Sequence, residues 1–201
     1  MRGPRATLPV SSLHLERALI IADPQRDFCE GGSLGVAGGA AVVSRIDSLL
    51  KSDHDYAYVI ATRDHHIDPG SHFAAQPDFV DSWPLHCVVG SAGAEFHDNL
   101  TVRDFAAVFY KGQYEPAYSA FEGATEDGGR LSDWLREREI DQVDICGIAT
   151  DYCVRATALD AVREGFQTKV LLGLTAAVAP ERVPEITTEL TAEGVTVSRS
   201  V

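Results

Sequence analysis

The sequence has no apolar run that approaches the roughly 20 residues a membrane-spanning helix needs. Residues 1–16 include two arginines but no apolar core segment, so they lack the pattern of a signal peptide. The four cysteines stand far apart and form neither a CxxC pair nor a disulfide framework. These absences favour a protein of the reducing cytoplasm.

Basic side chains are also scarce. The chain has 17 Lys and Arg against 30 Asp and Glu, which gives a formal net charge of -13. A surface of this sign repels nucleic-acid backbones and anionic lipids. We therefore expect neither a nucleic-acid partner nor a membrane partner.

The chain length of 201 residues, without internal repeats, fits one domain. Its hydrophobic content of 45% and charged content of 23% are ordinary for a globular protein. We expect a single domain over residues 17–201 and interpret residues 1–16 as a flexible N-terminal extension. Either a monomer or a homo-oligomer is compatible with the sequence.

Apolar runs that predict strands alternate with stripes that predict helices. The predicted strands are residues 17–23, 56–62, 106–110, 143–148, 170–172 and 195–197. Helical spacing predicts helices near residues 42–50, 131–138, 152–164 and 183–190. This alternation predicts a three-layer α/β/α sandwich with a mainly parallel sheet of roughly six strands.

Four reactive side chains stand where predicted strands end. Asp23 and Lys111 end the first and third strands, whereas Asp64 and Cys153 follow the second and fourth. Ligands of parallel sheets bind beyond the carboxyl ends of the strands. We therefore expect these four side chains to converge on one edge of the sheet.

The loop after the second strand is rich in metal-binding side chains. It supplies one carboxylate, Asp64, and three imidazoles, from His66, His72 and His86. Zinc, ferrous iron and manganese all accept such ligands, so the pattern predicts one divalent ion without identifying it. The alternative is a polar surface loop with unrelated histidines.

Cys153 falls in the first turn of a predicted helix, where partial positive charge favours a thiolate and can stabilise an oxyanion. Asp23 suits the role of proton acceptor and Lys111 that of the positive neighbour. Each residue also has a structural alternative. The cysteine could be a small core residue, the aspartate a cap and the lysine a solvated strand end.

Six segments of the sequence form a joint pattern of motifs: residues 23–34 (DPQRDFCEGGSL), 64–72 (DHHIDPGSH), 82–87 (SWPLHC), 109–112 (FYKG), 117–119 (AYS) and 147–154 (GIATDYCV). These motifs resemble those of nicotinamidases (pyrazinamidases), within the isochorismatase-like hydrolases. They occur in order over essentially the whole domain, so the joint pattern is very specific. Departures from the common pattern are Arg26, Leu85 and Tyr152, none of which removes a reactive group.

The resemblance implies metal-dependent hydrolysis of nicotinamide to nicotinate and ammonia, and of pyrazinamide to pyrazinoate, in NAD salvage. It implies a thioester on Cys153, with Asp23 and Lys111 completing a triad and water completing the metal shell. It also implies a cis peptide between Ile148 and Ala149. The residues expected to contact substrate, a small aromatic carboxamide, are Phe28, Trp83, Tyr118, Ile148 and Ala149, with the amides of Ala149 and Cys153 as the oxyanion hole.

Three other functions are alternatives to this one. An isochorismate-type hydrolase of the same fold would not need the metal loop. A non-catalytic metal-binding protein would have an unreactive Cys153. A glutaminase-type amidotransferase would need a histidine near the cysteine, and no histidine occurs after His97.

Overall fold

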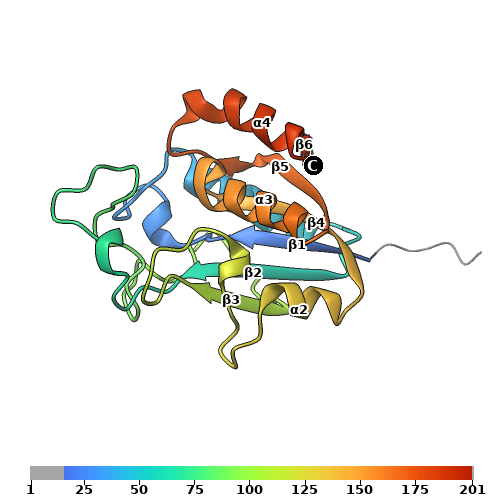
Figure 1. Cartoon of the computed structure of the whole chain (residues 1–201), viewed down its shortest axis with the longest axis horizontal. Helices are drawn as coiled ribbons and strands as arrows, with labels where there is room; N and C mark the ends of the chain where they lie inside the picture. The colour runs from blue at the N-terminus through green and yellow to red at the C-terminus, as the bar shows by residue number, and fades with distance from the viewer. Residues whose placement is uncertain (1–15, 201) are drawn as a thin grey trace, which may run out of the picture.

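A six-stranded, all-parallel sheet forms the centre of the protein, in a computed structural model that describes residues 16–200. The strand order is β3-β2-β1-β4-β5-β6. In chain order the strands are β1 (Glu16–Ala22), β2 (Tyr58–Asp64), β3 (Ala107–Lys111), β4 (Ile140–Ile148), β5 (Gln167–Ala176) and β6 (Thr196–Ser198). Their carboxyl ends point to the left-hand end of the molecule in Figure 1, where the long loops gather.

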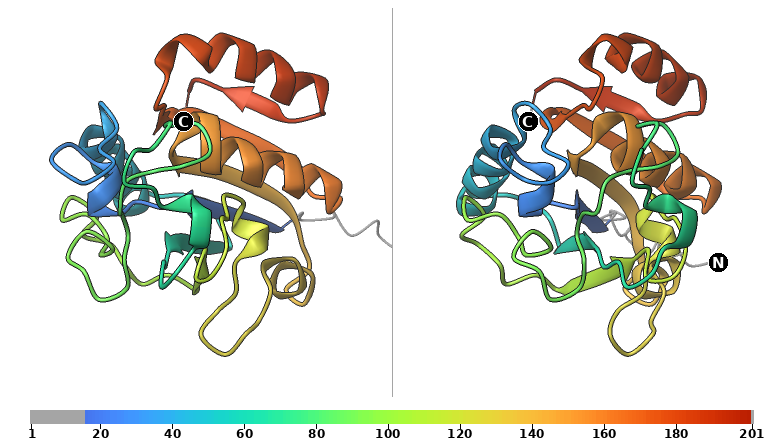
Figure 2. Two further views of the ribbon diagram at one scale, coloured as in Figure 1. Left: turned by 60° about the vertical axis from the view of Figure 1, so that its left-hand side comes forward. Right: turned by 90° about the vertical axis from the view of Figure 1, so that its left-hand side faces the viewer.

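Helices cover both faces of the sheet, which confirms the predicted three-layer α/β/α sandwich. They are α1 (Gly39–Lys51), α2 (Leu131–Arg136), α3 (Arg155–Arg163) and α4 (Val183–Ala192). Helix α1 lies on one face, and the other three pack on the opposite face (Figure 2, right). Over residues 16–200, no helix is both long and apolar enough to cross a bilayer.

Strand β1 shows why the sheet is buried on both faces. Ala18 and Ile20 belong to the core beneath α2, α3 and α4, whereas Leu19 and Ile21 belong to the core beneath α1. All four side chains are fully buried. A nearly continuous apolar run is typical of a parallel strand covered by helices, and each fully buried leucine or isoleucine contributes roughly 1.5–3 kcal/mol.

The structure differs from the predicted boundaries in several places. Strands β4 and β5 have 9 and 10 residues and so extend beyond the apolar runs that predicted them. Asp64 is the last residue of β2 rather than the start of the following loop. Glu16 begins β1, and the rest of the predicted N-terminal extension lies outside the described residues.

Asp47 ties α1 to the loop that returns towards β3. Its carboxylate accepts hydrogen bonds from the backbone N–H groups of Thr101 and Val102, at 2.6 and 2.9 Å. Burial alone would raise the pKa of Asp47, but the Lys51 ammonium and these N–H donors lower it to about 2. The charged carboxylate is therefore the form that stabilises the fold.

Replacing Asp47 by alanine should lower the free energy of unfolding at pH 7 by about 1–3 kcal/mol, because buried N–H donors lose a charged acceptor. The folded pKa of about 2 lies below the unfolded value of about 3.9. The contribution is thus present above pH ~4 and is lost as the pH falls towards ~2. In urea unfolding, the difference in the free energy of unfolding between the wild type and Asp47→Ala should be smaller at pH 3 than at pH 7. Asp53→Ala, at an exposed position, is the control. A stability difference between wild type and Asp47→Ala that does not change with pH would contradict the prediction.

Candidate active site

The reactive side chains converge at the carboxyl ends of the central strands. The sheet order reverses between β1 and β4, and this switch point is where open α/β sheets bind ligands. Asp23 follows β1, and Cys153 lies in a single π-helical turn, Thr150–Val154, that joins β4 to α3. Gly147 allows β1 and β4 to approach here, because a Cβ at this position would lie 2.1 Å from the Ala22 carbonyl oxygen.

Asp23, Lys111 and Cys153 form one buried cluster. The Lys111 Nζ atom lies 2.9 Å from Asp23 Oδ2 and 3.7 Å from the Cys153 sulfur. Thr62 holds the acid in place, since its hydroxyl donates to Asp23 Oδ1 at 2.7 Å and accepts from the Asp23 N–H at 3.1 Å. The structure thus brings together the acid, lysine and thiol that the sequence placed at three strand ends.

Lys111 also pairs with a second buried carboxylate, Asp64 Oδ1. Burial alone would lower the pKa of Lys111, but the charges of Asp23 and Asp64 raise it well above its ordinary value. Burial alone would raise the pKa of Asp64, but the Lys111 charge and the neighbouring histidines hold it well below. Lys111 is therefore a permanent cation between two acids.

The Cys153 thiol is neutral at rest. Burial raises its pKa well above the ordinary value, Lys111 opposes this rise, and Asp23 and Asp64 add to it. This differs from the thiolate that the helix N-terminus favours, because the buried surroundings outweigh the positive end of the helix. Burial likewise raises the pKa of Asp23, against the opposing Lys111 charge. The thiol therefore needs a proton acceptor in order to attack, and Asp23 is beside it.

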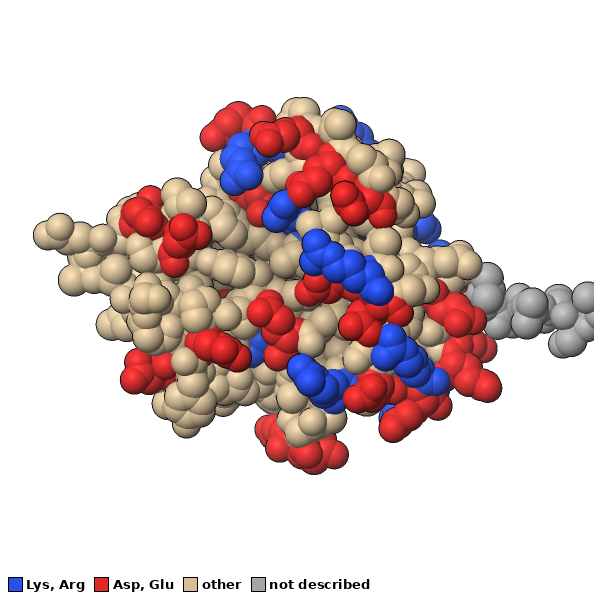
Figure 3. All heavy atoms as spheres, viewed as in Figure 1, with Lys and Arg blue, Asp and Glu red and all other residues tan. Residues whose placement is uncertain are grey.

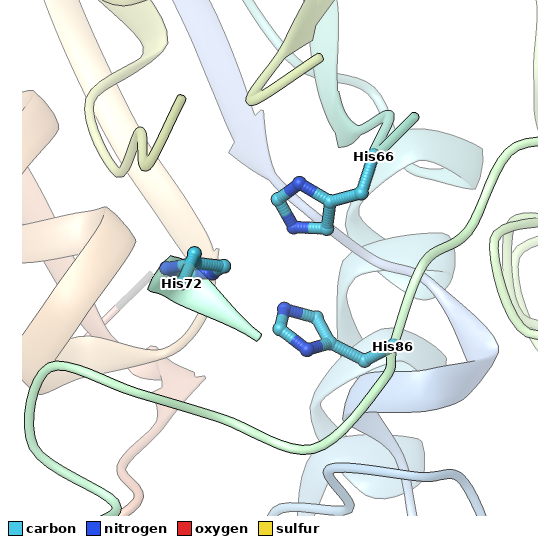
Figure 4. Close-up of side chains that lie close together, drawn as sticks. All are labelled: His66, His72 and His86. Atoms are coloured by element: carbon cyan, nitrogen blue, oxygen red, sulfur yellow. The ribbon is translucent and has the colours of Figure 1, made fainter. Parts of the chain in front are cut away.

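Three histidine rings meet next to this cluster (Figure 4). One ring nitrogen from each of His66, His72 and His86 lies within 4.8 Å of the others, and all three side chains are buried. Asp64 Oδ2 lies 3.5 Å from His66 Nε2 and 3.8 Å from His86 Nε2. Asp64 therefore lies beside two of the three predicted imidazoles, while the group of ring nitrogens within 4.8 Å of one another comprises the three histidines.

The hydrogen bonds of the rings leave their inner nitrogens free. His66 Nδ1 lies 2.6 Å from the Gly112 carbonyl oxygen, and His86 Nδ1 lies 2.8 Å from that of Pro84. Because a carbonyl only accepts, Nδ1 carries the proton in both rings and Nε2 keeps its lone pair. Among the described residues, the buried His66 Nε2 and His72 Nδ1 have no hydrogen-bond partner. Such a donor set fits a divalent metal ion.

An aromatic pocket joins the thiol to the histidines. Its lining includes Phe28, Trp83, Tyr118, Ala149 and Cys153, together with Asp64, His72 and His86. The Trp83 indole N–H donates to the Tyr118 hydroxyl at 3.1 Å. A larger hollow of about 890 Å³ lies between β3 and α2, but none of the reactive side chains lines it.

The residues that line the pocket differ in part from the residues predicted to contact the substrate. The peptide between Ile148 and Ala149 is cis, as the resemblance implies, but the Ile148 side chain is fully buried in the core beneath α1 and does not line the pocket. Four lining residues were not predicted: Leu34, Val36, Tyr152 and Val178. Two of them had a sequence signal: Leu34 ends the motif at residues 23–34, and Tyr152 stands next to the cysteine.

Residues 17–200 match the Isochorismatase domain family. The chain belongs to this family. It is 57% identical to the nicotinamidase/pyrazinamidase of Mycobacterium tuberculosis, over 82% of this chain and 89% of that protein. The fold is similar to a pyrazinamidase of Pyrococcus horikoshii in complex with zinc (TM-score 0.79, 35% identity, covering 91% and 98% of the two chains). It is also similar to PnC1 of L. infantum in complex with nicotinate (TM-score 0.80, 38% identity, covering 92% of each).

Gly112→Ala should weaken binding of a divalent metal, measured with zinc, by about 10-fold or more. A Cβ at Gly112 would lie 2.6 Å from His66 Cε1, so the added methyl group must displace the His66 ring. Gly128→Ala is the matched control, because Gly128 has the same left-handed backbone with nothing within 4 Å of the added Cβ. Competition with a chromogenic chelator measures both affinities. Equal affinities in the two variants would refute the role of this close approach.

Proposed function

We propose that this protein hydrolyses nicotinamide to nicotinate and ammonia, and pyrazinamide to pyrazinoate, through a thioester on Cys153. The observation that carries the proposal is that one aromatic pocket is lined by a buried thiol and by two of the three clustered histidines, His72 and His86, with the Asp23–Lys111 pair against the thiol. The identity of 57% to a nicotinamidase/pyrazinamidase supports it. The reaction belongs to NAD salvage in the cytoplasm, where the four free cysteines would remain reduced.

The pocket suits a small, flat and neutral substrate. Phe28 and Trp83 are almost fully buried, and with Tyr118 they offer aromatic surface to a pyridine or pyrazine ring. In Figure 3 the left-hand end of the molecule, where the loops gather, shows acidic but no basic side chains. An uncharged amide is not repelled by such a surface, whereas an anion such as isochorismate is.

The first half of the reaction releases ammonia. Asp23 takes the proton of the Cys153 thiol as the sulfur attacks the carboxamide carbon. The backbone N–H groups of Ala149 and Cys153 stabilise the resulting oxyanion, which is worth roughly 3–4 kcal/mol for one donor in other enzymes. Asp23 then gives its proton to the nitrogen as the carbon–nitrogen bond breaks. Ammonia leaves, and the acyl group stays on the sulfur.

The second half of the reaction hydrolyses the thioester and uses the same residues. Water attacks the thioester carbon, and Asp23 accepts a proton from it. The carbon–sulfur bond breaks, the acid is released, and the proton on Asp23 returns to the Cys153 sulfur. Lys111 stays charged throughout, so it stabilises Asp23 and the sulfur whenever either is anionic.

Asp64, His66, His72 and His86 are the residues that would hold the metal, with water completing its shell. When bound, the ion supplies a Lewis-acidic site for the pyridine nitrogen and so orients the ring. Zinc, ferrous iron and manganese all accept this donor set. Zinc, present in the Pyrococcus horikoshii pyrazinamidase, is the ion we favour.

Cys153→Ala should abolish ammonia release from nicotinamide, since no nucleophile remains. The expected loss is at least about 10³-fold in kcat with the fold intact. Cys146→Ala is the matched control, because Cys146 is an equally buried thiol inside β4. The control should keep activity within a few-fold. A coupled ammonia assay measures both variants, and activity in Cys153→Ala would refute the thioester.

Removing the metal with a chelator should abolish nicotinamide turnover, and added zinc, iron or manganese should restore it. The physical reason is that the ring loses its anchor in the pocket. Circular dichroism of the stripped protein checks that the fold survives. Full turnover by stripped and folded protein would show that the metal has no part in the reaction.

A further inference from the structure

Gln25 is a fully buried amide that the proposed reaction does not use. Its side-chain oxygen accepts from the Asp64 N–H at 2.8 Å, and its side-chain nitrogen donates to the Asp64 carbonyl at 2.9 Å. The same nitrogen donates to the Ala94 carbonyl at 2.8 Å. One side chain therefore satisfies both backbone groups of Asp64.

The two hydrogen bonds from Gln25 to the Asp64 backbone take the place of pairing with a neighbouring strand. Strand β1 pairs with β2 only as far as Ile21 opposite Ala61, so Asp64 extends beyond the end of that ladder. On its other side β2 continues to pair with β3, and the His65 N–H donates to the Lys111 carbonyl at 2.9 Å. The Gln25 amide thus continues the hydrogen-bond ladder of β2 where β1 has already ended.

The position of the Asp64 backbone matters because the two oxygens of its carboxylate contact different partners. Oδ1 pairs with Lys111, whereas Oδ2 faces the Nε2 atoms of His66 and His86. Lys111 is charged and buried, so it would draw the whole carboxylate towards itself if the backbone of Asp64 were free to shift. A fixed backbone keeps one oxygen for the lysine and the other for the metal.

We propose that Gln25 is a positioning residue for the metal centre, which acts by holding Asp64 in place as a ligand. The inference rests on the proposed function in one respect, the metal site formed by Asp64 and the three histidines. Partners that orient ligands in this way typically change metal affinity by 10–100-fold when they are removed.

The test is zinc affinity, measured by competition with a chromogenic chelator. Gln25→Met keeps the length of the side chain and removes all three hydrogen bonds, whereas Gln25→Glu can still accept from the Asp64 N–H. Asp47→Ala is the matched control, because it also removes a buried acceptor of two backbone N–H groups, away from the metal site. Thermal unfolding of the metal-free proteins shows whether the variants are comparably destabilised.

We expect a loss of zinc affinity of about 10-fold or more in Gln25→Met, a smaller loss in Gln25→Glu and less than twofold in Asp47→Ala. If Gln25→Met does not fold, Gln25→Glu decides, with the same direction expected. Wild-type affinity in a folded Gln25 variant, or an equal loss in Asp47→Ala, overturns the inference but leaves the proposed hydrolysis intact. A wild-type protein that binds no zinc overturns both the inference and the metal part of that proposal.

Discussion

The ammonium group of Lys111, buried between the carboxylates of Asp23 and Asp64, is the interaction on which the site depends. Two carboxylates buried together without a cation would repel each other and lose their hydration. Lys111 offsets both costs, and it also lies within 3.7 Å of the Cys153 sulfur. Lys111 therefore links Asp23 and Cys153 to Asp64, which lies beside the histidines.

The strand order explains how one side chain reaches both acids. Asp64 and Lys111 are in register on the neighbouring strands β2 and β3, so their pairing is local. Asp23 follows β1, two strands away from β3, which is roughly 10 Å at ordinary strand spacing. A lysine extended over the end of β2 covers most of that distance, and the left-handed backbone of Asp23 (φ 44°) turns the chain off the end of β1. A shorter basic side chain, such as histidine, would not span it.

The sequence was most informative about the residues at strand ends. Asp23, Asp64, Lys111 and Cys153 each lie at or just beyond an apolar run, and parallel strands bring their carboxyl ends together. Contacts between distant loops could not be predicted in this way. Val178 lines the pocket from beyond β5 with no pattern to mark it, and Ile148 points into the core because its neighbours determine which face is buried. The predicted β4 and β5 were too short because polar residues there continue the pairing.

In the short segment after β1, residues that contact the reactive groups alternate with residues that do not. Alternate residues each serve a different part of the site: Asp23 faces the thiol cluster, Gln25 holds Asp64, and Asp27 accepts from the Cys87 N–H, next to His86, at 2.7 Å. The intervening Arg26 turns outward and pairs with Asp98 at the surface. The left-handed backbone of Asp23 and the 3-10 turn over Arg26–Phe28 send neighbouring side chains of this short segment in different directions. Arg26, which departs from the common pattern of nicotinamidases, therefore makes no contact with the site, whereas a change at Gln25 or Asp27 would disturb the backbone at or next to a proposed metal ligand.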